Sequence, residues 1–205
     1  MTVIVVVGNP EPASRTLDAA TRVARALRPE LEPDVIDLIA FGATLLDRGP
    51  ALRRAFSRFP SGVVAVCAEV GGRLHGMAVS TFVPVSLDPP FAAFCVQNTS
   101  TTWPNLAAAE HLGLSLLGLD QHHAAKALAA RNSDRFSGVR VRREPTGAVL
   151  VHDAATWIEG TVETEVPAGD HAVVILRIRR LSDAVGGDPL VFHDGGFRQL
   201  ARRPA

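Results

Sequence analysis

Two clusters of short hydroxyl and amide side chains are the residues of this sequence best suited to hold a phosphate group. Ser80-Thr81 and Ser86 precede the segment Leu87-Asp88-Pro89-Pro90, and a second cluster, residues 98–102, follows the apolar run 91–96. Hydroxyl groups and backbone amides at strand ends can surround a phosphate without a positive side chain. The same residue types are common in ordinary turns, so residue type alone leaves both interpretations open.

The clusters are expected at the ends of two β-strands. Residues 76–85 alternate as a strand does, residues 87–90 form a turn, and residues 91–96 form a second, apolar strand. Upstream, a short helix around residues 52–59 ends at Pro60-Ser61-Gly62, and the Gly71-Gly72 pair then closes a hairpin on the strand 63–70.

The rest of the chain reads as more short strands with few helices. A helical segment begins at Trp103, and Asp120 is expected to cap a helix over residues 121–131. The remaining elements are expected as strands over residues 111–119, 155–165 and 171–178, as strand-like alternation over residues 141–150 with a turn at Pro145 and Gly147, and as a terminal hairpin over residues 190–200. This pattern predicts a mainly β, antiparallel barrel.

Residues 1–49 follow a different pattern. A β-branched run at residues 3–7, a helix capped by Ser14 and stopped by Pro29, and a strand over residues 35–41 make a βαβ unit. We therefore expect a short N-terminal βαβ extension before the main domain.

Composition excludes several classes of function. The formal charge is zero, with 21 basic and 21 acidic residues, so nothing favours nucleic acid or an anionic membrane. No segment approaches the roughly 18 consecutive apolar residues of a membrane span, and the start of the chain lacks a secretory signal, so we expect a cytoplasmic protein. Cys67 and Cys95 are expected as buried free thiols, and His122 and His123 as exposed side chains rather than metal ligands.

Six blocks of sequence, taken in order, carry a family resemblance: FPSGVVAV, HGMAVSTFVPVSLDPP, CVQNTSTTWPNL, DRFSGV, AGDHAVVILRI and PLVFHDGGFRQL. Over about residues 52–200 the chain resembles the flavin reductases, the split-barrel FMN- or FAD-binding proteins that supply reduced flavin to two-component monooxygenases. The resemblance implies an antiparallel split β-barrel, a homodimer, NADH or NADPH as the reductant, and a separate flavin-dependent monooxygenase as partner. It does not distinguish FMN from FAD.

The N-terminal extension is similar to the start of the NADPH-dependent FMN reductases of flavodoxin-like fold. A lone βαβ unit cannot cover both faces of its sheet. We therefore expect residues 1–49 to be a partial flavodoxin-like extension rather than a second flavin site.

The resemblance also implies site residues. Contacts with the flavin ring, ribityl chain and phosphate are assigned to Ala78, Val79, Ser80, Thr81, Ser86, Leu87, Gln97, Asn98, Ser100, Thr101 and Thr102. A loop formed by Asp134, Arg135 and Phe136 is expected to approach the flavin and the nicotinamide, although Arg135 read alone is a surface charge and Phe136 a lid over the core.

His171 is assigned the catalytic position, beside Asp170. Because the flavin carries the redox chemistry, we expect His171 to position a ligand rather than to transfer a proton. A hairpin turn closed by these two residues is the alternative.

Two departures from the family pattern favour moderate affinity for a diffusible flavin. Ala78 and Val79 stand where many relatives have threonine and alanine, and the phosphate cluster has no basic residue. A non-catalytic flavin-binding protein for storage or sensing is the alternative function. A pyridoxamine-phosphate oxidase type is disfavoured, because the sequence has no clustered Arg and Lys for a second phosphate.

Overall fold

The computed structural model of the protein describes residues 4–7, 21–26, 29–30, 34–37, 49–131, 134–182 and 187–200. The chain divides into two compact units, Met1–Ser57 and Arg58–Ala205. The sequence-based boundary between residues 49 and 52 therefore lies a few residues before the division.

In the first unit, β1 (Ile4–Val7) and β2 (Asp34–Asp37) form a parallel pair, and residues 21–26 are helical. The expected cap at Ser14 lies outside the described residues. The helix α3 (Gly49–Phe56) also belongs to this unit, and none of its residues is buried.

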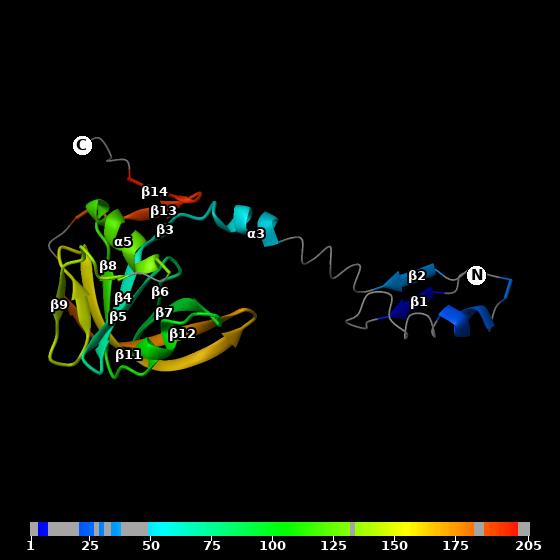
Figure 1. The fold of residues 1–205 in the computed structure, drawn as a ribbon, viewed down its shortest axis with the longest axis horizontal. Helices are drawn as coiled ribbons and strands as arrows, with labels where there is room; N and C mark the ends of the chain where they lie inside the picture. Colours follow the sequence, from blue (N-terminus) through cyan, green and yellow to red (C-terminus); the bar gives the residue numbers. More distant parts are fainter. Residues whose placement is uncertain are drawn as a thin grey trace. The chain divides into compact units, whose positions relative to one another are not determined.

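The second unit is built on a seven-stranded antiparallel sheet in the order β5-β4-β8-β11-β12-β7-β6 (Figure 1). Its strands are β4 (Val64–Val70), β5 (Arg73–Val79), β6 (Val83–Leu87), β7 (Pro90–Gln97), β8 (Leu112–Leu116), β11 (Thr156–Ala168) and β12 (His171–Ser182). The smaller elements are β3 (Ser61–Gly62), α4 (Trp103–Ala107), the 3-10 helix η1 (Leu119–Gln121), α5 (His122–Ala129), β9 (Val141–Arg143), β10 (Val149–Val151), β13 (Val191–His193) and β14 (Gly196–Arg198). The predicted mainly β, antiparallel architecture is confirmed.

The expectation of one continuous strand over residues 76–85 is wrong. The segment is divided between β5 and β6, which form the two opposite edges of the seven-stranded sheet. In a flat sheet, six strand intervals would separate these edges by about 29 Å. The link from Val79 to Val83 spans at most about 14 Å. The sheet must therefore curl until its edges approach each other, and residues 80–82 cross between them.

Other expected elements also differ in their ends, and the clearest case is the region from β8 to α5. The strand expected over residues 111–119 is limited to β8, because the chain turns into η1 at Leu119. Asp120 lies within η1 and does not cap α5, whose N-cap is Gln121. The Gln121 side chain accepts a hydrogen bond from Gly118 N–H (2.8 Å) and donates to His152 O (2.6 Å), which holds the start of the helix.

Two hydrophobic clusters pack on the sheet, and β4 contributes to both. Val64 and Val66 belong to one cluster, together with Phe94 and Trp103, whose rings meet edge to face at 5.5 Å. Cys67 belongs to the other, with the buried face of α5. This helix therefore rests on the sheet through Ala124, Ala125 and Leu128.

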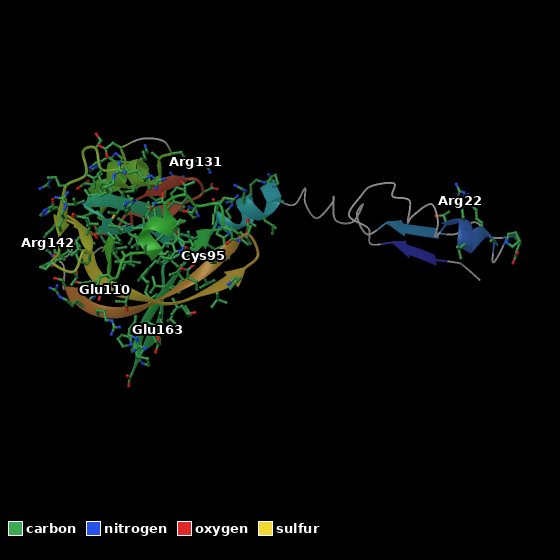
Figure 2. The ribbon with its side chains drawn as sticks, turned by 60° about the horizontal axis from the view of Figure 1, so that its bottom comes forward. Arg22, Cys95, Glu110, Arg131, Arg142 and Glu163 are labelled. Carbon is green, nitrogen blue, oxygen red and sulfur yellow. The ribbon has the colours of Figure 1, made fainter. Side chains whose placement is uncertain are left out.

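β11 and β12 form the longest hairpin, drawn yellow to orange in Figure 1. Arg177 of β12 donates two hydrogen bonds to Glu163 of β11 (2.8 and 2.9 Å) and lies 4.8 Å from the centre of the Phe91 ring. These hydrogen bonds lower the pKa of Glu163, which is labelled in Figure 2. The contacts join β11, β12 and β7 on one face.

Gly113 lies where β10 crosses β8 at close range. A Cβ atom built on Gly113 would stand 2.1 Å from the Val149 carbonyl oxygen, which is a backbone atom that cannot turn aside. At Gly118, whose φ is −79°, a Cβ atom would make its nearest contact at 3.5 Å, an ordinary distance.

We predict that Gly113→Ala destabilises the second unit by about 3 kcal/mol or more, since β10 must move away from the sheet. Gly118→Ala is the matched control and should change the free energy of unfolding by less than about 0.5 kcal/mol. Urea unfolding followed by tryptophan fluorescence measures both. Equal stability of the two variants would contradict the close packing of β10 on β8.

Candidate functional site

A cavity of about 580 Å³ opens where the end of β5, the end of β7, the following loop and the end of α5 meet. Its wall combines small apolar groups, hydroxyls, two arginines and one histidine. The lining residues are Met77, Ala78, Val79, Ser80, Thr81, Cys95, Val96, Gln97, Thr99, Ser100, Thr101, Thr102, Leu128, Ala129, Arg131, Arg135 and His171.

Ten of the residues expected at the site line this one cavity. They are Ala78, Val79, Ser80, Thr81, Gln97, Ser100, Thr101, Thr102, Arg135 and His171. The two hydroxyl clusters are brought together because residues 80–82 link the sheet edges while β7 ends beside them.

Five expected residues do not line the cavity: Ser86, Leu87, Asn98, Asp134 and Phe136. Ser86 and Leu87 lie at the far end of β6, next to the turn into β7, and the Leu87 side chain is 95 % exposed. The Asn98 side chain donates to Gly169 O in the β11–β12 turn, and the Asp134 side chain accepts a local hydrogen bond from Phe136 N–H.

Thr81 fixes the crossing between the two sheet edges. Its hydroxyl oxygen accepts a hydrogen bond from the Cys95 backbone N–H at 2.8 Å. Beyond it, β6 and β7 pair from Val83 and Ala93 onward, with one register shift between Pro84 and Ser86. The Thr81 hydroxyl thus replaces a backbone carbonyl as the partner of the Cys95 N–H on β7. The chain can therefore bend at Thr81 without leaving the Cys95 N–H unsatisfied.

The loop after β7 is compact and turns directly into α4. Ser100 N–H donates to Gln97 O (2.9 Å), and Trp103 N–H donates to Ser100 Oγ (3.1 Å). Thr102 occupies the N-cap position of α4, but its side chain makes no capping hydrogen bond. Thr102 lines the cavity.

Arg135 lines the cavity and also joins two of its walls. Its Nη1 donates to Gly76 O of β5 (3.0 Å) and to Leu128 O near the end of α5 (3.3 Å). The preceding Asp134 accepts a hydrogen bond from Phe136 N–H (3.0 Å), which shapes the turn. Arg135 is thus half-buried and held in place rather than a free surface charge.

Phe136 packs into the core beside α5, away from the cavity wall. A Cβ atom on Gly76 would stand 2.7 Å from Phe136 Cζ and 2.9 Å from Leu128 Cδ2, so only glycine leaves room for the ring. Phe136 is partly buried against the hydrophobic cluster beside α5, which is the position expected of a lid over the core.

Arg131 is a cavity residue that the sequence analysis missed. It lies just beyond the end of α5 and is exposed (Figure 2). Residues 98–102 contain no basic residue, but Arg131 and Arg135 line the same cavity as Ser100, Thr101 and Thr102. The sequence separates Arg131 from the hydroxyl loop, residues 98–102, by about thirty residues and gave no signal that the two meet.

His171 reaches the cavity from the start of β12. Its Nδ1 lies 2.8 Å from Asp170 Oδ1, and its side chain is 35 % exposed. Because a carboxylate only accepts hydrogen bonds, His171 Nδ1 is the donor in this pair. His171 thus lines the cavity and also pairs with Ala168 at the close of the β11–β12 turn.

The two cysteines occupy different environments, and both are free thiols. Cys67 is buried, and burial raises the pKa of its thiol to about 12. Cys95 is half-buried and lines the cavity, so the expectation that both thiols are buried is wrong for Cys95 (Figure 2).

A second cavity of about 530 Å³ lies near η1 and the start of α5, and none of the expected site residues line it. Its wall includes Asp120, His123, Arg140, His152 and Asp153, with Arg140 and Asp153 joined as an ion pair. Among the described residues, no group of three or more His, Cys, Asp or Glu side chains is arranged to hold a metal ion.

The helices within the described part of the chain include none that is long and apolar enough to cross a membrane. His122 and His123 are both exposed, as expected.

Comparison with known proteins matches residues 56–201 to the model of the flavin reductase like domain. A flavin reductase from Pseudomonas putida is 34 % identical over 150 residues, which cover 73 % of this chain and 88 % of the relative. The reductase subunit of a flavin-dependent monooxygenase from Rhodococcus jostii is 26 % identical over 71 % of this chain and 74 % of its own length.

Among solved structures, an NADH:FAD oxidoreductase from Streptomyces globisporus, in complex with NAD and FAD fragments, is similar with a TM-score of 0.69. The two are 28 % identical, and the match covers 73 % of this chain and 91 % of that one. The split-barrel fold expected from the sequence is thereby confirmed. The family match, the identity to the relatives and the shared fold together show that this chain belongs to the flavin reductase family.

Proposed function

We propose that the protein is an NAD(P)H:flavin oxidoreductase that supplies reduced FMN or FAD to a separate flavin-dependent monooxygenase. The observation that carries the proposal is the single cavity in which the hydroxyl loop, two arginines and His171 come together. Its volume of about 580 Å³ lies within the usual range for small-molecule sites. The relatives' names, a flavin reductase and the reductase subunit of a monooxygenase, support the same activity.

The hydroxyl loop and the arginines are assigned to the flavin phosphate. Ser100, Thr101 and Thr102 offer hydroxyl donors, and Arg131 adds a positive charge at the same cavity. Hydrogen bonds to a charged acceptor contribute more than neutral ones. Ala78 and Val79 then offer a small, flat wall for the ring system, with Ser80 and Thr81 at its edge.

The nicotinamide supplies the hydride and the flavin ring accepts it, so the protein's task is to bind, orient and exclude water. His171 is assigned to the nicotinamide side. Held by Asp170 through Nδ1, its ring can accept a hydrogen bond from a carboxamide N–H at Nε2. This role is orientation, and no proton transfer by His171 is required.

We also propose that the protein acts as a homodimer in the cytoplasm. β6 is an edge strand with three exposed apolar side chains, Val83, Val85 and Leu87. Contact with a second copy of the chain would cover these side chains. Residues 1–49 are proposed to be an extension without a flavin site of their own. The parallel pairing of β1 and β2 supports a βαβ arrangement there.

We predict that the purified protein oxidises NADH or NADPH rapidly only when FMN or FAD is added, as followed by absorbance at 340 nm. His171→Ala should raise the KM for the nicotinamide about two- to tenfold, the loss of one hydrogen bond, and leave the flavin KM nearly unchanged. Flavin binding without any turnover would favour the non-catalytic storage or sensing function instead.

We predict that Arg131→Gln weakens binding of FMN about two- to tenfold but leaves riboflavin, which has no phosphate, unchanged. The loss should shrink as salt is added, because Arg131 is exposed. Flavin fluorescence titration measures both affinities. Arg73→Gln on β5 is the matched control, since Arg73 is exposed and does not line the cavity. An equal loss for FMN and riboflavin would contradict a phosphate role for Arg131.

We predict that a thiol reagent at pH 8 modifies Cys95 quickly and Cys67 only after unfolding. Cys67 is buried with a thiol pKa raised to about 12, so almost no thiolate is present at that pH. Saturating flavin should slow the modification of Cys95, and Cys95→Ser should remove the fast phase. A Cys95 rate that does not respond to flavin would argue against flavin occupying this cavity.

A further inference from the structure

Asn98 lies in the hydroxyl loop but does not line the cavity. Its side chain turns to the tip of the β11–β12 hairpin, where Nδ2 donates to Gly169 O (3.1 Å). Its backbone N–H donates to Asp170 O (3.0 Å). Asn98 therefore donates to two successive carbonyl groups, those of Gly169 and Asp170, in the turn that precedes His171.

The position of Asn98 follows from the strand register. β7 and β12 pair up to Gln97 and His171, and Asn98 is the next residue along β7. The turn it meets contains Gly169 with φ of 66°, a left-handed conformation that glycine adopts readily. Asn98 thus continues the hydrogen bonding between β7 and the hairpin by one residue beyond the last strand pair, Gln97 and His171.

The other end of the same loop is fastened to the same hairpin. Trp103 Nε1 donates to Glu165 Oε2 of β11 at 3.1 Å, and Trp103 itself is buried. The loop of residues 98–102 is thereby attached to the hairpin at both ends. The hydroxyl groups assigned to the phosphate and the histidine assigned to the nicotinamide are therefore both held by the β11–β12 hairpin.

We propose that Asn98 is a positioning residue that orients His171 in the cavity by holding the turn at Gly169 and Asp170. Without the amide donor, the turn keeps its strand pairing and the backbone bond to Asp170 O but loses the side-chain bond to Gly169 O. The Asp170 carboxylate and the His171 ring then sample other orientations. This inference rests on the proposed role of His171 in orienting the nicotinamide.

The test is a double-mutant cycle between Asn98→Ala and His171→Ala, with the KM for NADH or NADPH and the KM for flavin measured separately. Asn98→Ala should raise the nicotinamide KM about two- to tenfold. In the His171→Ala background the same change should have less than about a twofold effect, because the residue acts through His171. Asn98→Asp keeps the shape but loses the donor, and it should raise the nicotinamide KM as Asn98→Ala does, which provides a second variant if the alanine variant fails to fold. The negative charge that it adds near the phosphate loop should appear separately, in the flavin KM.

Asn105→Ala is the matched control. Asn105 is also an exposed asparagine that donates to a backbone carbonyl, Thr101 O, but at 3.4 Å and away from the hairpin. It should leave both KM values within about twofold of the parent chain.

Three outcomes would overturn the inference. Equal effects of Asn98→Ala with and without His171 would assign Asn98 a general structural role, while the proposed role of His171 would stand. Equal effects of Asn98→Ala and Asn105→Ala would indicate loosening of the whole loop. A His171→Ala variant with an unchanged nicotinamide KM would instead remove the proposed role of His171, and the role of Asn98 with it.

Discussion

The short link between β5 and β6 is the constraint on which the rest of the second unit depends. These strands are the two edges of a seven-stranded sheet, yet only residues 80–82 separate them in the chain. The sheet has to curl to satisfy that link, and curling brings the end of β5 beside the end of β7. Thr81 stabilises the crossing by accepting the Cys95 N–H (2.8 Å). The cavity is a consequence of barrel closure, and its hydroxyl groups come from the residues that make the closure possible.

The walls of the cavity are joined to one another by polar contacts rather than left as separate surfaces. Arg135 links β5 to the end of α5, and Asn98 and Trp103 link the hydroxyl loop to the β11–β12 hairpin. Hydride transfer requires two ring systems to be held at near-attack distance, and small displacements reduce its rate. A cavity whose walls are hydrogen-bonded to one another is suited to that requirement. The redox chemistry itself is carried by the flavin and the nicotinamide.

The sequence predicted much of this arrangement, and its errors have physical causes. Alternation and turn residues located most strands, and ordered motifs located ten of the residues that meet in the cavity. Alternation continues through residues 80–82, so it could not reveal that the chain changes partner strands there. Arg131 escaped notice because a helix end and a distant loop meet only in the folded chain. Asn98 has a residue type suited to phosphate, but strand register directs its amide to Gly169 instead.

Hydrogen exchange with and without FMN tests the central claim most directly, because it locates the ligand on the whole chain. Occupation of the proposed site predicts slower exchange in residues 76–81, 95–102, 128–131 and 134–135, which line or border the larger cavity. Residues 118–124 and 151–155, which border the second cavity, should exchange at unchanged rates. Protection confined to the second cavity, with none around Thr81 and the hydroxyl loop, would contradict the assignment of the flavin site.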